Sequence, residues 1–267
     1  MKLQIYQVDA FASEPFRGNP AAIVPLDKWL PDDVMQNIAL ENNLAETAFF
    51  VPGEKGYDLR WFTPTIEMDL CGHATLAAGY LVFEVLGTDQ STLRFQTQSG
   101  ELTVEKDGGR YVLDFPSRPG VPTEAPAGLI EAIGAEPNEV FKSRDYMLVY
   151  GSEAEIRAID PDFGALIKAG PDPVIVTAKG DSADFVSRFF APEVGVWEDP
   201  VTGSAHCTLI PYWAERLGKN KLFARQVSAR GGELHCELVG DRVKIGGEAV
   251  LYMKGEIYVA SEKSAGA

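Results

Sequence analysis

Two short segments of the sequence combine a glycine with side chains that can bind or transfer a proton. They read Cys71-Gly-His73 and Thr202-Gly-Ser204, and each precedes a run of residues with helical character. The N-terminus of a helix presents unpaired backbone N–H groups and the positive end of the helix dipole, and glycine lets a ligand approach that backbone closely. Gly72 and Gly203 are therefore expected to bind a carboxylate in one cleft, unless each glycine serves only as a turn.

Three side chains are candidates for binding and transferring protons, and one of them is His73 of the first segment. Glu46 lies among the small and apolar residues of 44–49, and a carboxyl group in such surroundings loses water, which suits a general acid or base. His73 could bind or shuttle a proton near neutral pH. Asp199 precedes the second glycine in a loop. Each also has an ordinary explanation: a surface carboxylate, a helix-capping histidine and a solvated loop residue.

The cysteines and histidines lack the spacing of a disulfide framework or a metal site. Cys71, Cys207 and Cys236 are odd in number and far apart, which indicates a reducing compartment and a cytoplasmic protein. No CxxC, HExxH, Walker or GxGxxG motif occurs. We therefore expect no metal ion and no cofactor.

Composition and charge narrow the class of partner. The chain has 267 residues, of which 45% are hydrophobic, and a formal net charge of −15, so it has the composition of a globular protein with an acidic surface. Such a surface repels phosphate, which argues against nucleic acid and anionic membranes. No apolar run reaches the ~18 residues of a membrane helix, and the N-terminal residues show no signal core. The expected partner is instead the small carboxylate that the two helix N-termini would bind.

Internal similarity is the strongest organisational feature of the chain. Segments 72–87 and 203–218 align at an offset of 131 residues, and segments 60–64 and 188–192 align at an offset of 128. Several coincidences in the same order, at nearly the same offset, indicate two homologous halves. The Pro-rich stretch at 116–126 is interpreted as the joint between them.

Each half is expected to fold as a curled sheet around one helix. The helix at 73–86 is apolar on all sides, which indicates burial on every side. Its counterpart at 204–217 contains Pro211, which predicts a bend. The fold class is therefore α+β, with two β-barrel-like domains related by a pseudo-twofold axis. The domains are expected at 1–116 and 117–267, with the C-terminal strand as a candidate to complete the first.

Other elements follow from local signals. A helix is expected at 32–43, after Pro31. Hairpins are expected at 101–115 and 234–245, where Gly-containing turns separate short β-type runs. Arg230-Gly-Gly232 predicts a bulge in a strand, with anion contact by Arg230 as the alternative.

Six motifs span nearly the whole chain: Val8-Asp-Ala-Phe11, Gly18-Asn-Pro20, Asn43-Leu-Ala-Glu-Thr-Ala48, Cys71-Gly-His-Ala-Thr75, Glu198-Asp-Pro-Val-Thr-Gly-Ser-Ala205 and Arg230-Gly-Gly-Glu-Leu234. In these motifs the chain resembles the PhzF-like family, which is named for an isomerase of phenazine biosynthesis. The resemblance implies the diaminopimelate-epimerase-like fold, with the active site between two similar domains, and suggests a homodimer.

By the same resemblance, Glu46 matches the family's catalytic acid/base. The positions that match its substrate-binding and proton-handling residues are His73, Asp199 and Ser204, with Gly72 and Gly203 as backbone donors. The phenazine enzyme moves a proton of a dihydro-hydroxyanthranilate without a cofactor, and that substrate is not carried over. The leading hypothesis is a cofactor-independent isomerase of a small carboxylate-bearing metabolite, with proton transfer by Glu46 in an inter-domain cleft.

Two alternatives stay open. Related racemases and epimerases place one cysteine before each duplicated glycine, whereas this chain has Cys71 before the first and Thr202 before the second. A Cys71-dependent racemase or epimerase would therefore lack its second thiol. The other alternative is a non-catalytic small-molecule binding protein with the same fold.

The isomerase hypothesis also predicts a geometry. Glu46, His73, Asp199 and Ser204 come from both halves and must converge on one cleft. The helix N-termini at Gly72 and Gly203 should face each other across a small ligand, on the order of 10 Å apart.

Overall fold

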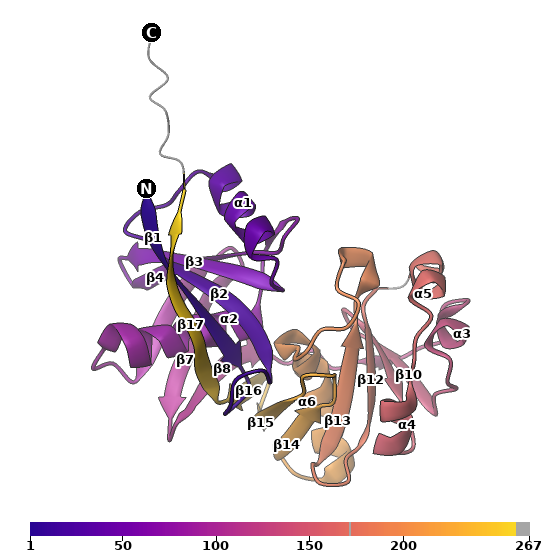
Figure 1. The fold of residues 1–267 in the computed structure, drawn as a ribbon. Coiled ribbons are helices and arrows are strands. Elements are labelled where there is room, and N and C mark those ends of the chain that lie inside the picture. The colour runs from indigo at the N-terminus through magenta and orange to yellow at the C-terminus, as the bar shows by residue number, and fades with distance from the viewer. Residues whose placement is uncertain (171, 260–267) are drawn as a thin grey trace.

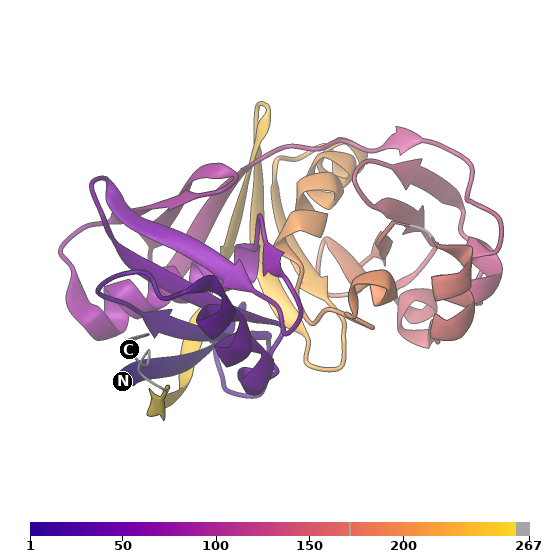
Figure 2. The ribbon, with the colours of Figure 1, turned by 90° about the horizontal axis from the view of Figure 1, so that it is seen from above.

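The computed structural model describes residues 1–170 and 172–259, and its strands form two lobes that lie side by side (Figures 1 and 2). The strands are β1 (Lys2–Ala10), β2 (Asn19–Pro25), β3 (Glu46–Gly53), β4 (Gly56–Phe62), β5 (Glu67–Met68), β6 (Thr92–Thr97), β7 (Gly100–Asp107), β8 (Arg110–Pro116), β9 (Val121–Pro122), β10 (Glu139–Lys142), β11 (Tyr146–Val149), β12 (Val174–Lys179), β13 (Phe185–Phe190), β14 (Lys221–Gln226), β15 (Gly232–Val239), β16 (Arg242–Gly247) and β17 (Ala249–Tyr258). The helices are α1 (Asp32–Asn42), α2 (Gly72–Tyr80), the π-helix η1 (Leu81–Gly87), α3 (Leu129–Ile133), α4 (Glu153–Ala158), α5 (Phe163–Ala169), the short 3₁₀-helix η2 (Pro192–Val194) and α6 (Gly203–Leu217).

The two halves of the chain repeat one pattern of strand pairing. Along β1, β2, β3, β4, β6, β7 and β8, successive pairs are antiparallel, parallel, antiparallel, parallel, antiparallel and antiparallel. The strands from β10 to β16 pair in the same order and with the same directions. This agreement supports the two homologous halves that the sequence predicts.

The halves also exchange strands. After β8, the chain crosses to the second lobe, where β9 pairs with β10. After β16, it crosses back, and β17 pairs along the length of β1. The C-terminal strand thus lies in the sheet of the first lobe (Figure 1), while the division of the chain at residue 116 stays a prediction.

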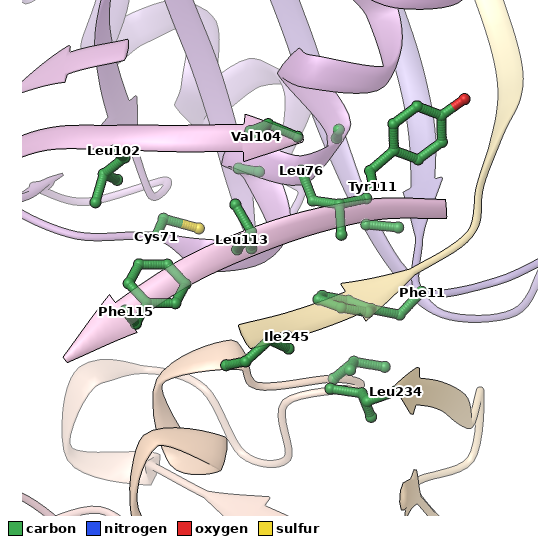
Figure 3. Packing of buried hydrophobic residues seen from close by; sticks show 14 of the residues in the cluster. Phe11, Cys71, Leu76, Leu102, Val104, Tyr111, Leu113, Phe115, Leu234 and Ile245 are labelled. Atoms are coloured by element: carbon green, nitrogen blue, oxygen red, sulfur yellow. The ribbon is translucent and has the colours of Figure 1, made fainter. Parts of the chain in front are cut away.

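A direct sheet contact joins the lobes. Strand β8 pairs antiparallel with β16, and Leu113 lies opposite Ile245. Both side chains are fully buried and belong to a continuous hydrophobic cluster that includes residues of α2 and α6. Figure 3 shows this packing, with Phe115 of β8 close to Cys71 at the start of α2.

The two central helices occupy equivalent places in the lobes, and each departs in part from expectation. Residues 72–79 of α2 are buried, as predicted, but the expected single helix to residue 86 becomes π-helical from Leu81, and Leu86 is exposed. The apolar pattern could not reveal this, because it does not distinguish hydrogen bonds to residue i−4 from bonds to residue i−5.

Helix α6 continues through Pro211. A proline has no N–H, so it cannot bond the carbonyl four residues earlier, which here belongs to Cys207. The backbone N–H of Arg118 donates to that carbonyl at 2.9 Å. The segment that joins the two halves therefore satisfies the group that Pro211 leaves free, and the bend predicted at Pro211 stays a prediction.

The remaining local predictions mostly hold. Helix α1 and both hairpins are present, and the turns use glycines with positive φ, namely Gly108, Gly109 and Gly240. Arg230 lies in the loop between β14 and β15, so the predicted strand bulge is wrong: the guanidinium donates to the carbonyls of Gly18 (2.8 Å) and Arg17 (3.0 Å). Among the described residues, no helix is long and apolar enough to cross a membrane.

Candidate active site

The first two predicted proton-handling residues meet. Glu46 is the first residue of β3, which runs parallel to β2, and His73 is the second residue of α2. Glu46 Oε2 lies 3.1 Å from His73 Nε2, with the two side chains only 14% and 5% exposed. The structure therefore brings a largely buried carboxyl group and a buried imidazole into direct contact.

Asn19, at the start of β2, connects this pair to Asp199. Its side-chain Nδ2 donates to Asp199 Oδ1 at 2.8 Å and to the Val201 carbonyl at 2.9 Å, and lies 3.2 Å from His73 Nδ1. Asn19 is fully buried. The sequence reasoning quoted it within Gly18-Asn-Pro20 but gave it no role, because an Asn before a Pro is also an ordinary turn residue.

The start of α6 holds Asp199 from the other side. Thr202 is the residue before the helix, and its hydroxyl donates to Asp199 Oδ2 at 2.5 Å. Gln226 of β14 accepts the Thr202 N–H at 2.8 Å and donates to the Asp199 carbonyl at 2.7 Å. These bonds fix the Asp199 carboxylate toward Asn19.

Ser204 makes a different contact from the one expected. As the second residue of α6, it occupies the place that His73 has in α2, but its hydroxyl accepts a hydrogen bond from Arg144 at 3.0 Å. Arg144 in turn pairs with the buried Asp145. Arg144 is a cation at the helix start that the sequence reasoning missed, because a lone arginine in a loop carries no distinguishing pattern.

The N-termini of α2 and α6 face each other, but they lie closer than predicted. A methyl group built on Gly72 would be 3.5 Å from Gly203 Cα, so the two backbones are nearly in contact. The expected separation on the order of 10 Å is therefore wrong for this structure. The β8–β16 pairing brings the helix starts together directly, without room for a ligand between the glycines.

Burial shifts the titration of the clustered groups. It raises the pKa of Asp199 to about 6, and Glu46 adds to this, while His73 opposes it. Burial raises the pKa of the Cys71 thiol above 9.0. Burial lowers the pKa of His73, but Cys71 and Glu46 raise it, and the net shift is upward from 6.5.

The site is asymmetric although its scaffold is duplicated. Glu46 opens the strand that pairs parallel with β2, whereas Val174 opens the corresponding strand beside β11. Cys71 precedes the first helix and Thr202 the second. The strand start and the helix start of the first half therefore carry a carboxylate and a thiol, whereas the equivalent positions of the second half carry a valine and a threonine.

Three side chains of the cluster are potential metal ligands. The ligand atoms of Glu46, Cys71 and His73 lie within 4.8 Å of one another. However, Cys71 Sγ faces His73 Nδ1 at 3.6 Å, while Glu46 faces Nε2. The two contacts use different ring nitrogens, and the absence of a metal stays a prediction.

The largest described cavity lies outside this cluster. It has a volume of about 480 Å³ and is lined by the loops after β1 and β14, not by Glu46, His73 or Asp199. Each of its four arginines already pairs with a carboxylate: Arg17 with Glu14, Arg157 with Glu153, Arg225 with Glu233 and Arg230 with Asp9. The convergence of proton-handling groups, rather than cavity size, marks the candidate active site.

Two lobes with the same order and direction of strand pairing, each around one central helix, define an epimerase-like α+β fold. The chain matches, over 96% of its length, a hydroxyproline epimerase from Agrobacterium vitis, with a TM-score of 0.63, 9% identity and 92% of that chain covered, which concerns the fold alone.

Closer relatives identify the family. A family model described as phenazine biosynthesis-like protein matches residues 8–255. An uncharacterized isomerase of Pseudomonas aeruginosa is 52% identical over 97% of this chain and all of the relative. The crystal structure of a PhzF-family protein from Enterococcus faecalis superposes with a TM-score of 0.94 and 50% identity, covering 97% of this chain and all of that one. The chain belongs to the PhzC-PhzF family.

The raised pKa of Asp199 predicts a pH-dependent cost to stability. A carboxyl group whose pKa rises from 3.8 to about 6 on folding binds its proton more tightly in the folded state, so its ionised form destabilises the fold above pH 6. We expect Asp199→Asn to raise the free energy of unfolding at pH 8 by on the order of 2 kcal/mol. The gain should shrink as the pH falls from 6 to 4, as measured by urea unfolding at each pH.

The exposed Asp89 gives a control with the same change in charge. Asp89→Asn should leave the free energy of unfolding nearly unchanged at every pH. A stability gain for Asp199→Asn that does not vary with pH would contradict the assigned shift.

Proposed function

We propose that the protein is a cofactor-independent isomerase of a small carboxylate-bearing metabolite, with Glu46 as the group that transfers the proton. The observation that carries this proposal is the contact of a largely buried carboxyl group with a buried histidine where two helix N-termini meet. Membership of the PhzC-PhzF family and the isomerase names of its relatives support the reaction class. A cytoplasmic homodimer is part of the same proposal.

The reaction follows from the chemistry of these groups. Glu46 removes a proton from a carbon next to an activating group, and the electron pair of the broken C–H bond moves into the conjugated system. The protonated Glu46 exchanges with solvent and then delivers a proton to another carbon, so that one proton is removed and one is returned. Backbone N–H groups at a helix N-terminus stabilise the negative charge that develops, which is often one of the larger contributions to catalysis.

The other residues take supporting roles in this proposal. His73 contacts the reacting carboxyl group, and Asp199, fixed by Thr202 and Asn19, orients the substrate. Ser204 and the backbone N–H groups at the start of the second helix are suited to binding the substrate carboxylate, while Arg144, which is paired with Asp145, holds the Ser204 hydroxyl. The lobes must separate slightly to admit a ligand between Gly72 and Gly203.

Replacing Glu46 tests the assignment directly. We expect wild-type protein, incubated in heavy water with a panel of small carboxylates and amino acids, to transfer deuterium into at least one compound, as detected by mass spectrometry. Glu46→Gln should abolish this uptake because an amide cannot accept the proton. Glu41→Gln changes an exposed glutamate of α1 and should retain full uptake. Full uptake by Glu46→Gln would refute the proposed role.

The helix-start glycines supply a second test. Neither Gly72 nor Gly203 has a positive φ, and a methyl group on Gly72 would meet only ordinary contacts, at 3.5 Å to Gly203 Cα and 3.7 Å to the Phe115 ring. Gly72→Ala should therefore fold with an unchanged melting temperature. It should nevertheless lower deuterium uptake by roughly 100-fold, because the methyl group occupies the space that a substrate needs beside the N–H donors.

Gly255→Ala is the matched control, since its methyl group would lie 3.8 Å from Ile5, in β17 of the first lobe. That variant should keep both stability and uptake. If Gly72→Ala retains full uptake, the helix start does not bind the substrate.

A second candidate function has one specific observation in its favour. Cys71 Sγ lies 3.6 Å from His73 Nδ1, within the proposed site, so a thiol-based racemase or epimerase is conceivable. The opposite position holds Thr202, and the remaining thiols are buried elsewhere, with burial raising the pKa of Cys207 to about 11. Two-base chemistry therefore lacks its second base, and the single carboxylate is favoured.

Cys71→Ser discriminates between the two functions. If Glu46 is the acid/base, this variant should retain deuterium uptake within about threefold of wild type, because the serine preserves the small polar side chain before α2. A loss comparable to that of Glu46→Gln, together with substrate protection of the wild-type thiol against iodoacetamide, would favour the racemase instead.

A further inference from the structure

Asn19 is placed to decide where His73 carries its proton. The Asn19 side chain is fully buried and its Nδ2 has three neighbours that can accept: the Val201 carbonyl, Asp199 Oδ1 and His73 Nδ1. A backbone carbonyl can only accept a hydrogen bond. The amide must therefore turn its NH₂ group toward Val201, and the same group then also faces Asp199 and His73.

The opposite orientation of the amide is disfavoured. Exchanging the two ends would place Oδ1 about where Nδ2 lies, against the Val201 carbonyl and the Asp199 carboxylate, which are both acceptors. In the orientation observed, no donor among the described residues reaches Asn19 Oδ1. A buried acceptor left without a partner is costly, so the contacts of the NH₂ group must be what holds the side chain in place.

This orientation constrains the imidazole. A proton on Nδ1 would point at the NH₂ group of Asn19, placing one donor against another at 3.2 Å. A lone pair on Nδ1 would instead share one of the two hydrogens of that group, which also donates to Asp199 and to the Val201 carbonyl. The remaining ring nitrogen, Nε2, lies 3.1 Å from Glu46 Oε2, although the two atoms are not aligned as a hydrogen bond. An N–H at Nε2 places its partial positive charge beside the carboxyl group.

We propose that Asn19 is a positioning residue that holds neutral His73 in the Nε2–H tautomer, with the protonated nitrogen beside Glu46 Oε2. The assignment rests on hydrogen-bond chemistry alone, while its catalytic consequence rests on the proposed function. That consequence is that Nε2–H stabilises the ionised form of Glu46, which must be unprotonated to begin the reaction. Asn19 also works against the imidazolium, which Glu46 favours.

The competing arrangement is specific. Cys71 Sγ lies 3.6 Å from Nδ1, so an Nδ1–H tautomer would donate to the sulfur. Sulfur is a weak acceptor, and this tautomer would leave a lone pair on Nε2 facing the carboxyl oxygens of Glu46. Both ring nitrogens would then have poor partners, because Nδ1–H would face a weak acceptor and the Nε2 lone pair would face carboxyl oxygens.

Long-range ¹H–¹⁵N correlation spectra of protein labelled with ¹⁵N-histidine distinguish the two tautomers and the charged ring. The chain has three histidines, and His206 provides an internal control. Its Nδ1 lies 2.8 Å from the Thr202 carbonyl, so it must carry the proton there, and burial lowers its pKa to about 4. Between pH 6 and 9.5 we expect an Nδ1–H pattern for His206 and, once the His73 ring is neutral, an Nε2–H pattern for His73.

Variants separate the role of Asn19 from a general effect of the site. Asn19→Leu is nearly isosteric and removes the NH₂ group that faces Nδ1, so neutral His73 should show a mixture of tautomers. Asn19→Ser is the smaller change, to be used if the leucine variant does not fold, and should also allow a mixture of tautomers. In Asp199→Asn, the Val201 carbonyl still orients Asn19, so the Nε2–H pattern should persist.

An Nδ1–H pattern for neutral His73 in the wild type would overturn the inference, as would a ring that stays doubly protonated at pH 9.5. An Nε2–H pattern unaffected by Asn19→Leu or Asn19→Ser would also overturn it, since the tautomer would not depend on the amide. These readings need no substrate. They are therefore independent of deuterium uptake, whose loss or retention in Glu46→Gln tests the proposed function separately.

Discussion

The antiparallel pairing of β8 with β16 is the interaction on which the rest of the structure depends. Each strand ends a hairpin of its own half, so their pairing joins the two curled sheets edge to edge. Leu113 and Ile245 then belong to one buried cluster with residues of both central helices. Because each helix is held inside its sheet, fixing the sheets edge to edge also fixes the helix starts, and Gly72 meets Gly203.

The strand exchange strengthens this arrangement. Strand β9, which follows the last hairpin of the first lobe, pairs in the second lobe, and β17, which follows the last hairpin of the second lobe, pairs in the first. Each lobe therefore contains one strand from the other half of the chain. The joining segment also donates to the carbonyl that Pro211 leaves free. Hydrogen bonds between the lobes, such as those from Arg230 to the loop before β2, connect them at further points. The candidate site therefore lies between two lobes whose relative motion is restrained.

A symmetric scaffold here carries asymmetric chemistry. The same position holds Glu46 in one half and Val174 in the other, and likewise Cys71 or Thr202, and His73 or Ser204. The first half thus contributes Glu46, Cys71 and His73 to the cluster, and the second contributes Asp199 and a helix start whose Ser204 is bound by Arg144. The arrangement is costly, because it buries a carboxyl group, an imidazole and an unpartnered amide oxygen together. Such local cost is typical of sites selected for reaction rather than for stability.

The sequence by itself determined the duplication, the apolar central helices, the hairpins and most of the cluster. These features appear in the sequence as local patterns, namely a repeat, a periodicity, a glycine turn or a motif beside a helix start. Only the tertiary structure decided how near the helix starts lie, where α2 changes to π-helix, and that Arg230 binds carbonyls across the joint. It also decided that Asn19 contacts His73, Asp199 and Val201 at once. Those contacts join residues up to 182 positions apart, and no local pattern encodes a distance or the direction in which a buried amide must turn.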